Sequence, residues 1–116
     1  MLQDEITKPM STDSSFANVT VALCICTCNR PEGLRRALEG VAQSAFAGRL
    51  RVIVADNHAG LAGMKLCEEM APSYRFPLVW LAEPQPGISH VRNAALRTAL
   101  TAACDFVAFK IGRAHV

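Results

Sequence analysis

The chain of 116 residues is long enough for one small domain with a hydrophobic core. Hydrophobic residues make up 51% of it and charged residues 19%, which is typical of a globular protein and excludes an intrinsically disordered one. The net charge is only +2, and no apolar run approaches the roughly 20 residues needed to cross a bilayer, so the sequence favours neither a nucleic-acid-binding protein nor a membrane-spanning one.

The amino-terminal segment is polar and acidic, without the apolar stretch of a secretory signal peptide. We expect residues 1–17 to form a disordered leader, followed by a cytoplasmic protein. Five cysteines in a chain without a signal peptide are also typical of a reducing compartment.

Apolar runs of strand length alternate with stretches of helical periodicity after this leader. In chain order, we predict a strand at residues 19–26, a helix at 31–46, a strand at 50–55, a helix at about 61–71, a strand at 77–82, a helix at 88–103 and a strand at 105–109. This alternation predicts right-handed βαβ crossovers and hence a doubly wound α/β fold, in which a parallel sheet carries helices on both faces. The periodicity places on buried helix faces Leu34, Leu38, Val41, Ala42 and Ala45 in the first helix, and Ile88, Val91, Ala95 and Ala99 in the third.

Cysteines occupy alternate positions at the end of the first predicted strand, at Cys24, Cys26 and Cys28. In a strand these side chains face one side and do not surround a metal ion. The sequence has neither the second ligand pair of a zinc site nor a CxxC motif at a helix start, so we interpret these cysteines as structural. Cys67 and Cys104 are interpreted as small apolar fillers in helical segments.

Polar segments follow three successive strands: TCNR, then DN, then EPQPGISHVRN. Ligands of open α/β sheets bind beyond the carboxyl ends of the strands, so these segments predict a nucleotide site at one edge. Asp56 suits a nucleobase or ribose hydroxyls, Arg92 suits phosphate, and Gly87 allows a close approach of the backbone to a ligand. Taken singly, Asp56 could cap a turn, Asn29 could cap the first helix and Arg92 could be a solvated helix residue.

Two histidines lie near these segments. Ser89 and His90 are neighbours on a predicted helix and do not face one another, so they form no catalytic dyad. We interpret His58 as a solvated loop residue.

The order of these segments between residues 19 and 109 resembles the family 2 glycosyltransferases, which have a GT-A fold. The residues that carry the resemblance are TCNR after the first strand, Asp56 and Asn57 after the second, and GISHVRN at residues 87–93. The resemblance implies the Rossmann-like nucleotide-binding half of an inverting glycosyltransferase of polysaccharide biosynthesis. Its partners would be a nucleotide-sugar donor and a glycan or lipid-linked acceptor, with no nucleic acid involved. The parent enzyme would be cytoplasmic, or peripheral to a membrane.

The resemblance also implies a role for each candidate residue. A first wall of the donor site would come from Cys26, Thr27, Asn29 and Arg30. Asp56 and Asn57 would hold the base; many family members have two acids there, which leaves open which of the two makes the main contact. The donor nucleotide would also lie against Gly87, Arg92 and Asn93.

The sequence departs from the family after the fourth predicted strand, where the family has an Asp-x-Asp motif that binds Mg²⁺ or Mn²⁺. Asp105 precedes that strand and is not this motif, so we expect no metal or other cofactor and no catalytic residue in this chain, but Mg²⁺ or Mn²⁺ in the parent. The residues IGRAHV at 111–116 resemble a translated sequencing adapter. We therefore expect residues 18–109 to be a partial, inactive glycosyltransferase domain, truncated after its fourth strand, and residues 110–116 to be an artefactual tail, whose removal leaves ten basic and ten acidic side chains.

Two other classes of protein share the predicted α/β pattern. A dinucleotide-dependent oxidoreductase should carry GxGxxG after the first strand, where this sequence has only Gly33. A non-catalytic nucleotide-binding or interaction module remains the alternative, although an interaction module gives no reason for polar loops after three strands in succession.

Overall fold

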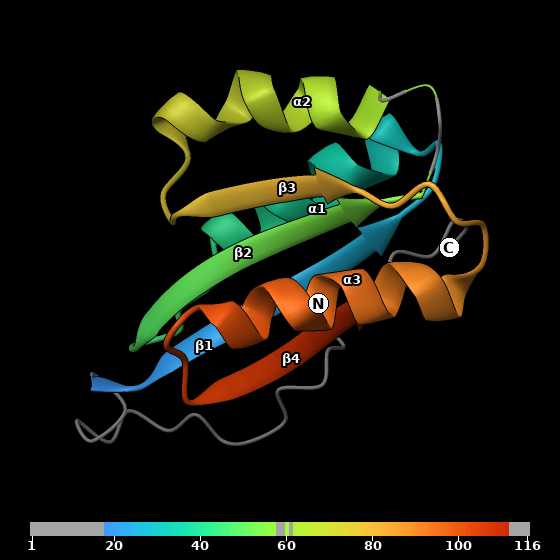
Figure 1. The fold of residues 1–116 in the computed structure, drawn as a ribbon. Coiled ribbons are helices and arrows are strands. Elements are labelled where there is room, and N and C mark those ends of the chain that lie inside the picture. The colour runs from blue at the N-terminus through green and yellow to red at the C-terminus, as the bar shows by residue number, and fades with distance from the viewer. Residues whose placement is uncertain (1–17, 58–59, 61, 112–116) are drawn as a thin grey trace.

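The computed structural model describes residues 18–57, 60 and 62–111, and the predicted leader and His58 lie outside these residues. Strands and helices alternate along the chain, with a short 3-10 turn after the second helix (Figure 1). The elements are β1 (Thr20–Thr27), α1 (Pro31–Ala42), β2 (Arg49–Asp56), α2 (Ala62–Met70), the 3-10 turn (Ala71–Ser73), β3 (Leu78–Ala82), α3 (Ile88–Thr101) and β4 (Phe106–Ile111).

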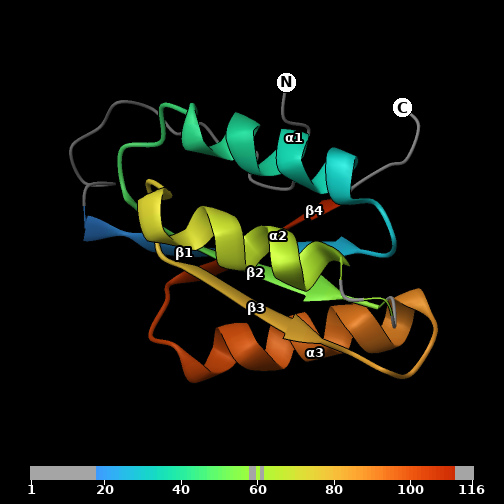
Figure 2. The same ribbon diagram turned by 90° about the horizontal axis from the view of Figure 1, so that it is seen from above.

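The four strands form one sheet in the order β3-β2-β1-β4, and every neighbouring pair is parallel. Helices α1 and α2 lie on one face and α3 lies on the other (Figure 2). The α/β class, the parallel sheet and the helices on both faces are therefore confirmed. No helix among the described residues is long and apolar enough to cross a membrane.

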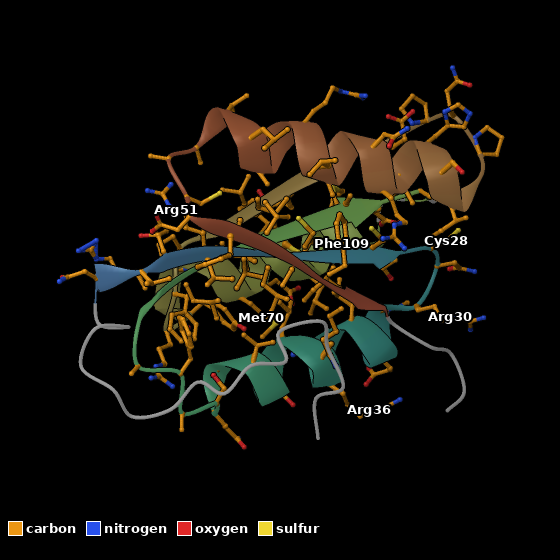
Figure 3. All side chains as sticks on the ribbon, turned by 90° about the horizontal axis from the view of Figure 1, so that it is seen from below. Cys28, Arg30, Arg36, Arg51, Met70 and Phe109 are labelled. Carbon is orange, nitrogen blue, oxygen red and sulfur yellow. The ribbon has the colours of Figure 1, made fainter. Side chains whose placement is uncertain are left out.

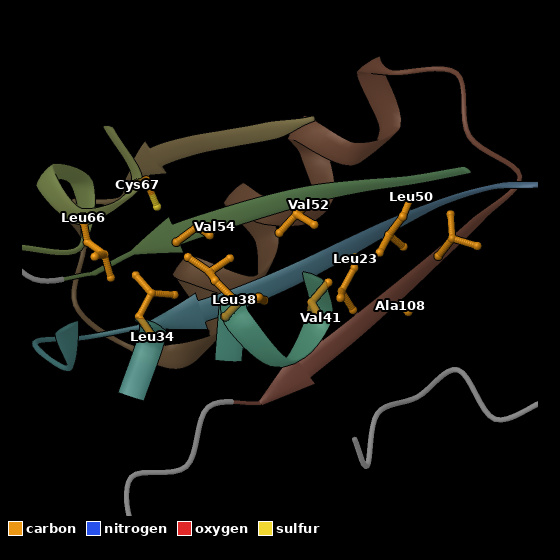
Figure 4. Close-up of a cluster of buried hydrophobic side chains, with 12 residues drawn as sticks. Leu23, Leu34, Leu38, Val41, Leu50, Val52, Val54, Leu66, Cys67 and Ala108 are labelled. Carbon is orange, nitrogen blue, oxygen red and sulfur yellow. The ribbon is translucent and has the colours of Figure 1, made fainter. Parts of the chain in front are cut away.

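The two faces of the sheet are built from alternate residues of the same strands, as strand geometry requires. On the α1 and α2 face, strand residues such as Leu23 and Val54 pack against Leu34 and Leu38 (Figure 4). The α3 face is lined by smaller side chains, and the helix contributes Val91, Ala94, Ala95 and Ala99. Alanine lets a helix backbone approach a sheet closely, so the composition of α3 fits its place over β1 and β2.

Helix α1 ends at Ala42, four residues before the predicted end, and Ala45 is exposed instead of buried. The reason is a tertiary contact: the Arg75 guanidinium donates hydrogen bonds to the carbonyl oxygens of Ala42 (2.7 Å) and Ser44 (2.8 Å). These carbonyls would otherwise lack partners at the helix end. Phe46 follows the helix in an irregular segment and still packs against the core.

Three further predictions are corrected. Ile88 is 61% exposed because it begins α3, one turn before the first helix residue that reaches the sheet. Cys104 is half-buried, but it lies in the connection after α3 and not in a helix. Strand β4 runs from Phe106 to Ile111 instead of residues 105–109, because Lys110 and Ile111 continue the pairing with β1. The rest of the predicted tail, residues 112–116, lies outside the described residues.

Candidate functional site

The carboxyl ends of three strands lie side by side, as the sequence predicts. Thr27 of β1 pairs with Asp56 of β2, which pairs with Ala82 of β3. Backbone hydrogen bonds continue past the strands, from Asn57 N–H to Thr27 O and from Glu83 N–H to Asp56 O, both at 2.9 Å. The polar segments after β1, β2 and β3 therefore meet at one edge of the sheet.

Asp56 is 1% exposed and is the buried charged residue of the described part of the chain. Its carboxylate points to the α2 side of the sheet: a Cβ placed on Gly63 would lie 2.6 Å from Asp56 Oδ2 and 3.4 Å from Leu34 Cδ2. Burial raises the pKa of the Cys67 thiol to about 12, and the nearby Asp56 carboxylate makes a smaller contribution in the same direction. A contact between Asp56 and a nucleobase stays a prediction.

Asn57 is bound to the segment that joins β3 to α3. Its Nδ2 group donates hydrogen bonds to Glu83 O (2.8 Å) and Gln85 O (2.7 Å), and its Oδ1 accepts one from Gly87 N–H (3.1 Å). The side-chain amide thus holds three backbone groups of the neighbouring loop. The contact of Asn57 with a base stays a prediction.

The segment after β1 turns outward from the sheet. Asn29 has a positive φ of 54°, which asparagine tolerates better than most residues, and Cys28, Asn29 and Arg30 are exposed. Figure 3 shows Cys28 and Arg30 beyond the carboxyl end of β1. Arg30, and not Asn29, is the residue that caps α1, and its side chain makes no capping hydrogen bond. The alternative role for Asn29 as a helix cap is therefore excluded.

Arg92 lies over an aromatic ring. Its guanidinium carbon is 4.5 Å from the centroid of Phe109 on β4, a favourable cation–π distance, and Phe109 packs on the α3 side of the sheet (Figure 3). Burial raises the pKa of the half-buried Cys26 thiol, and the Arg92 charge lowers it by a smaller amount. The structure therefore brings together Cys26, Arg92 and Phe109 near the end of β1. Asn93, the next residue on α3, is exposed.

The turn before α3 depends on Gly87. Its φ of 117° is a conformation that side chains disfavour, so glycine is required there for the backbone itself. Ser89 and His90 are exposed in the first turn of the helix, and His90 N–H donates to Gly87 O. Among the described residues, no group of three or more His, Cys, Asp or Glu side chains is arranged to hold a metal ion.

Two contributors to this edge were missed by sequence reasoning. Phe109 reads as one more apolar residue of a strand, and only the position of α3 across the sheet shows that it supports Arg92. Glu83 binds its own loop, because its Oε2 accepts a hydrogen bond from Gln85 N–H (2.9 Å). The sequence of the EPQPG segment could have indicated this role of Glu83. Gln85 stands between two prolines, so its N–H is a donor that needs an acceptor, and the Glu83 carboxylate is two residues away.

The structure is that of an α/β protein in which polar segments meet beyond the carboxyl ends of parallel strands, the position at which open α/β sheets bind their ligands. The chain is similar to the succinoglycan biosynthesis protein ExoM of Rhizobium meliloti strain 1021, with 37% identity over 87 residues. The match covers 73% of this chain but 27% of the relative, so the chain spans about a quarter of the length of the curated relative that it matches. No protein-family model and no solved structure matches the chain.

Proposed function

We propose that residues 18–109 form the donor-binding part of a family 2 glycosyltransferase that acts in polysaccharide biosynthesis. The observation that carries the proposal is the meeting of the Thr27, Asp56 and Ala82 strand ends at one edge, with Arg92 nearby on α3. The similarity to a protein named for succinoglycan biosynthesis supports the same class of reaction. The donor would be a nucleotide sugar, and the acceptor a glycan or a lipid-linked glycan.

The proposed reaction is a substitution at the anomeric carbon of the donor sugar. An acceptor hydroxyl forms the new glycosidic bond and gives up its proton to a general base of the parent enzyme, while the bond between the sugar and the nucleoside diphosphate breaks with inversion of configuration and the diphosphate leaves. Arg30, exposed after β1, and Arg92, exposed on α3, are positively charged and would bind the diphosphate. Cys26, Thr27 and Asn29 would form the adjoining wall of the site.

The base would lie near Asp56 and Asn57, and Gly87 and Asn93 would lie along the nucleotide. In the parent enzyme, Mg²⁺ or Mn²⁺ would be held together with the donor diphosphate, and we propose no metal ligand among the residues of this edge. We therefore assign donor binding to these residues, and neither metal binding nor the transfer step.

Asp56 gives the sharpest test, because a carboxylate that is 1% exposed serves either a ligand or the core. We expect the ¹⁵N-labelled chain to bind uridine diphosphate (UDP), with amide chemical-shift changes at residues 26–30, 56–57 and 87–93. Asp56→Asn removes the charge with little change of shape and is expected to weaken this binding about tenfold, since hydrogen bonds to charged groups contribute about 1.5–3 kcal/mol.

The matched control is Asp105→Asn at the opposite end of the sheet, where the Asp105 carboxylate accepts a hydrogen bond from Thr20 N–H. UDP affinity should not change in this variant. An Asp56→Asn variant that is less stable to urea, but binds UDP with the affinity of the unsubstituted 116-residue chain, would assign Asp56 to the core alone. No shift of any amide at the edge with UDP or guanosine diphosphate would contradict the proposed donor site.

A further inference from the structure

We infer that Asn57 is a positioning residue, which fixes the segment between β3 and α3 and through it the placement of Arg92, and that it does not act through a contact with the base. This inference rests on the proposed donor site and goes further by separating the roles of the two adjacent residues Asp56 and Asn57. It starts from the three hydrogen bonds that the Asn57 side chain makes to backbone groups of Glu83, Gln85 and Gly87.

The segment Glu83–Gly87 has few ways to hold its own shape. Its sequence is EPQPG, and the two prolines have no N–H group, so the segment has three backbone donors. All three are used: Glu83 N–H bonds to Asp56 O, Gln85 N–H to Glu83 Oε2, and Gly87 N–H to Asn57 Oδ1. Asn57 also supplies the donors for two carbonyl oxygens of the same segment, those of Glu83 and Gln85. Most of the links from this segment to the sheet therefore pass through one side chain.

The chemistry of this arrangement requires an amide. The two Nδ2 hydrogens bind two carbonyl oxygens while Oδ1 binds an N–H, a combination that a carboxylate cannot provide because it has no donor. Aspartate at position 57 would place a charged oxygen beside the carbonyl oxygens of Glu83 and Gln85. The Asn57→Asp change is therefore nearly isosteric and still removes two hydrogen bonds.

The consequence extends to α3. Gly87 holds its φ of 117° directly before the first residue of this helix, and its carbonyl accepts hydrogen bonds from His90 and Val91 N–H. Arg92 lies one residue further along the helix, over Phe109. A loop released from Asn57 would free Gly87 and the first turn of α3, and would loosen the placement of the Arg92 guanidinium.

The test has two independent measurements on the 116-residue chain. Hydrogen exchange followed by NMR is expected to show the Gly87 amide exchanging about tenfold faster in Asn57→Asp than in the unsubstituted chain. The carboxylate of the variant can still accept a hydrogen bond from Gly87 N–H, but it has lost the two hydrogen bonds to Glu83 O and Gln85 O that hold the loop beside it. The matched control is Gln85→Glu, which adds the same charge in the same loop but keeps the backbone bonds to Asn57. Its Gly87 amide should exchange at the parent rate. Unchanged Gly87 exchange in Asn57→Asp would overturn the inference.

The second measurement uses UDP and inorganic pyrophosphate as probes. In Asn57→Asp, affinity is expected to fall about tenfold for both, since the effect passes through Arg92 and not through the base; in Gln85→Glu it should fall less than threefold for either. A loss confined to UDP would make Asn57 a base contact and overturn the inference. Faster exchange with unchanged affinity for both probes would reduce Asn57 to a structural role, which also overturns it. If the unsubstituted chain binds neither UDP nor pyrophosphate, the proposed donor site is wrong. The exchange data alone then decide whether Asn57 fixes the loop.

Discussion

Above about pH 9, the folded chain is expected to lose stability steeply, because two buried thiols resist ionisation in the folded state. Burial, with smaller contributions from the nearby Cys26 and Cys104, raises the pKa of Cys24 from 9.0 to about 12. Burial and the Asp56 carboxylate raise the pKa of Cys67 to about 12 as well. The two thiols lie on opposite faces of the sheet, Cys24 against α3 and Cys67 on the side of α1 and α2, so they report on the whole fold.

The sign follows from proton binding in the two states. Below pH 9 both states hold the thiol protons, and the stability that depends on them is fully present. Between pH 9 and about 12 the unfolded chain loses these protons and the folded chain keeps them, so the free energy of unfolding falls by about 1.4 kcal/mol per pH unit for each thiol. Tyr74 donates a hydrogen bond from its phenol to Leu38 O. Burial, with a smaller contribution from the Cys67 thiol, raises the pKa of Tyr74 to about 12, so this residue adds to the loss of stability above pH 10.

Urea unfolding of the reduced chain between pH 8 and 11 measures this slope. The parent should lose about 3 kcal/mol per pH unit above pH 9, provided that it remains folded. A Cys24→Ala, Cys67→Ala variant should be less stable at pH 8, where the lost packing dominates, but should show a much shallower slope above pH 9. Parallel slopes for the two chains would contradict the burial of these thiols.

Much of the fold could be predicted from the sequence because local pattern and tertiary structure agree in it. The central residues of β1 (Val21–Cys26) and β2 (Val52–Ala55) are all apolar, as strands covered on both faces require. The spacing of Leu34, Leu38 and Val41 predicted the buried stripe of α1. The errors arose where a residue far away in the sequence determines where a helix or strand ends. Arg75 ends α1 by binding its last carbonyls, and the pairing with β1 extends β4 to Ile111.

The sequence predicted where the candidate site lies, at the carboxyl ends of the strands, but not which contacts its side chains make. Parallel strands must bring their carboxyl ends to one edge, so the meeting of Thr27, Asp56 and Ala82 follows from topology alone. Topology does not say which way a polar side chain points. Asp56 turns towards α2 and Asn57 binds the loop before α3, although the two are adjacent in the chain. Alternation along a strand gives the physical reason, since neighbouring residues leave its end in opposite directions.

The close approach of Asp56 to α2 predicts opposite effects for two glycine-to-alanine changes in helices. A Cβ at Gly40 in α1 would meet nothing within 4 Å, so Gly40→Ala is expected to stabilise the chain by up to about 1 kcal/mol through helix propensity. A Cβ at Gly63 in α2 would lie 2.6 Å from Asp56 Oδ2, closer than real contacts allow. Because Asp56 is almost fully buried, it has little room to move, and Gly63→Ala is expected to cost about 1–3 kcal/mol.

A double-mutant cycle separates this contact from any other effect at Gly63. In an Asp56→Ala background the carboxylate is gone, and the Gly63→Ala change should then cost less than about 0.5 kcal/mol, measured by urea unfolding at pH 7. The same cost in both backgrounds would show that the carboxylate does not lie against α2. A cost that disappears with Asp56 would show that glycine at position 63 is needed because a charged side chain of β2 occupies the space beside the helix. The UDP affinity of Gly63→Ala then links packing to the proposed site: a carboxylate displaced by the new methyl group should weaken binding if Asp56 contacts the donor, and should leave it unchanged if Asp56 serves the core alone.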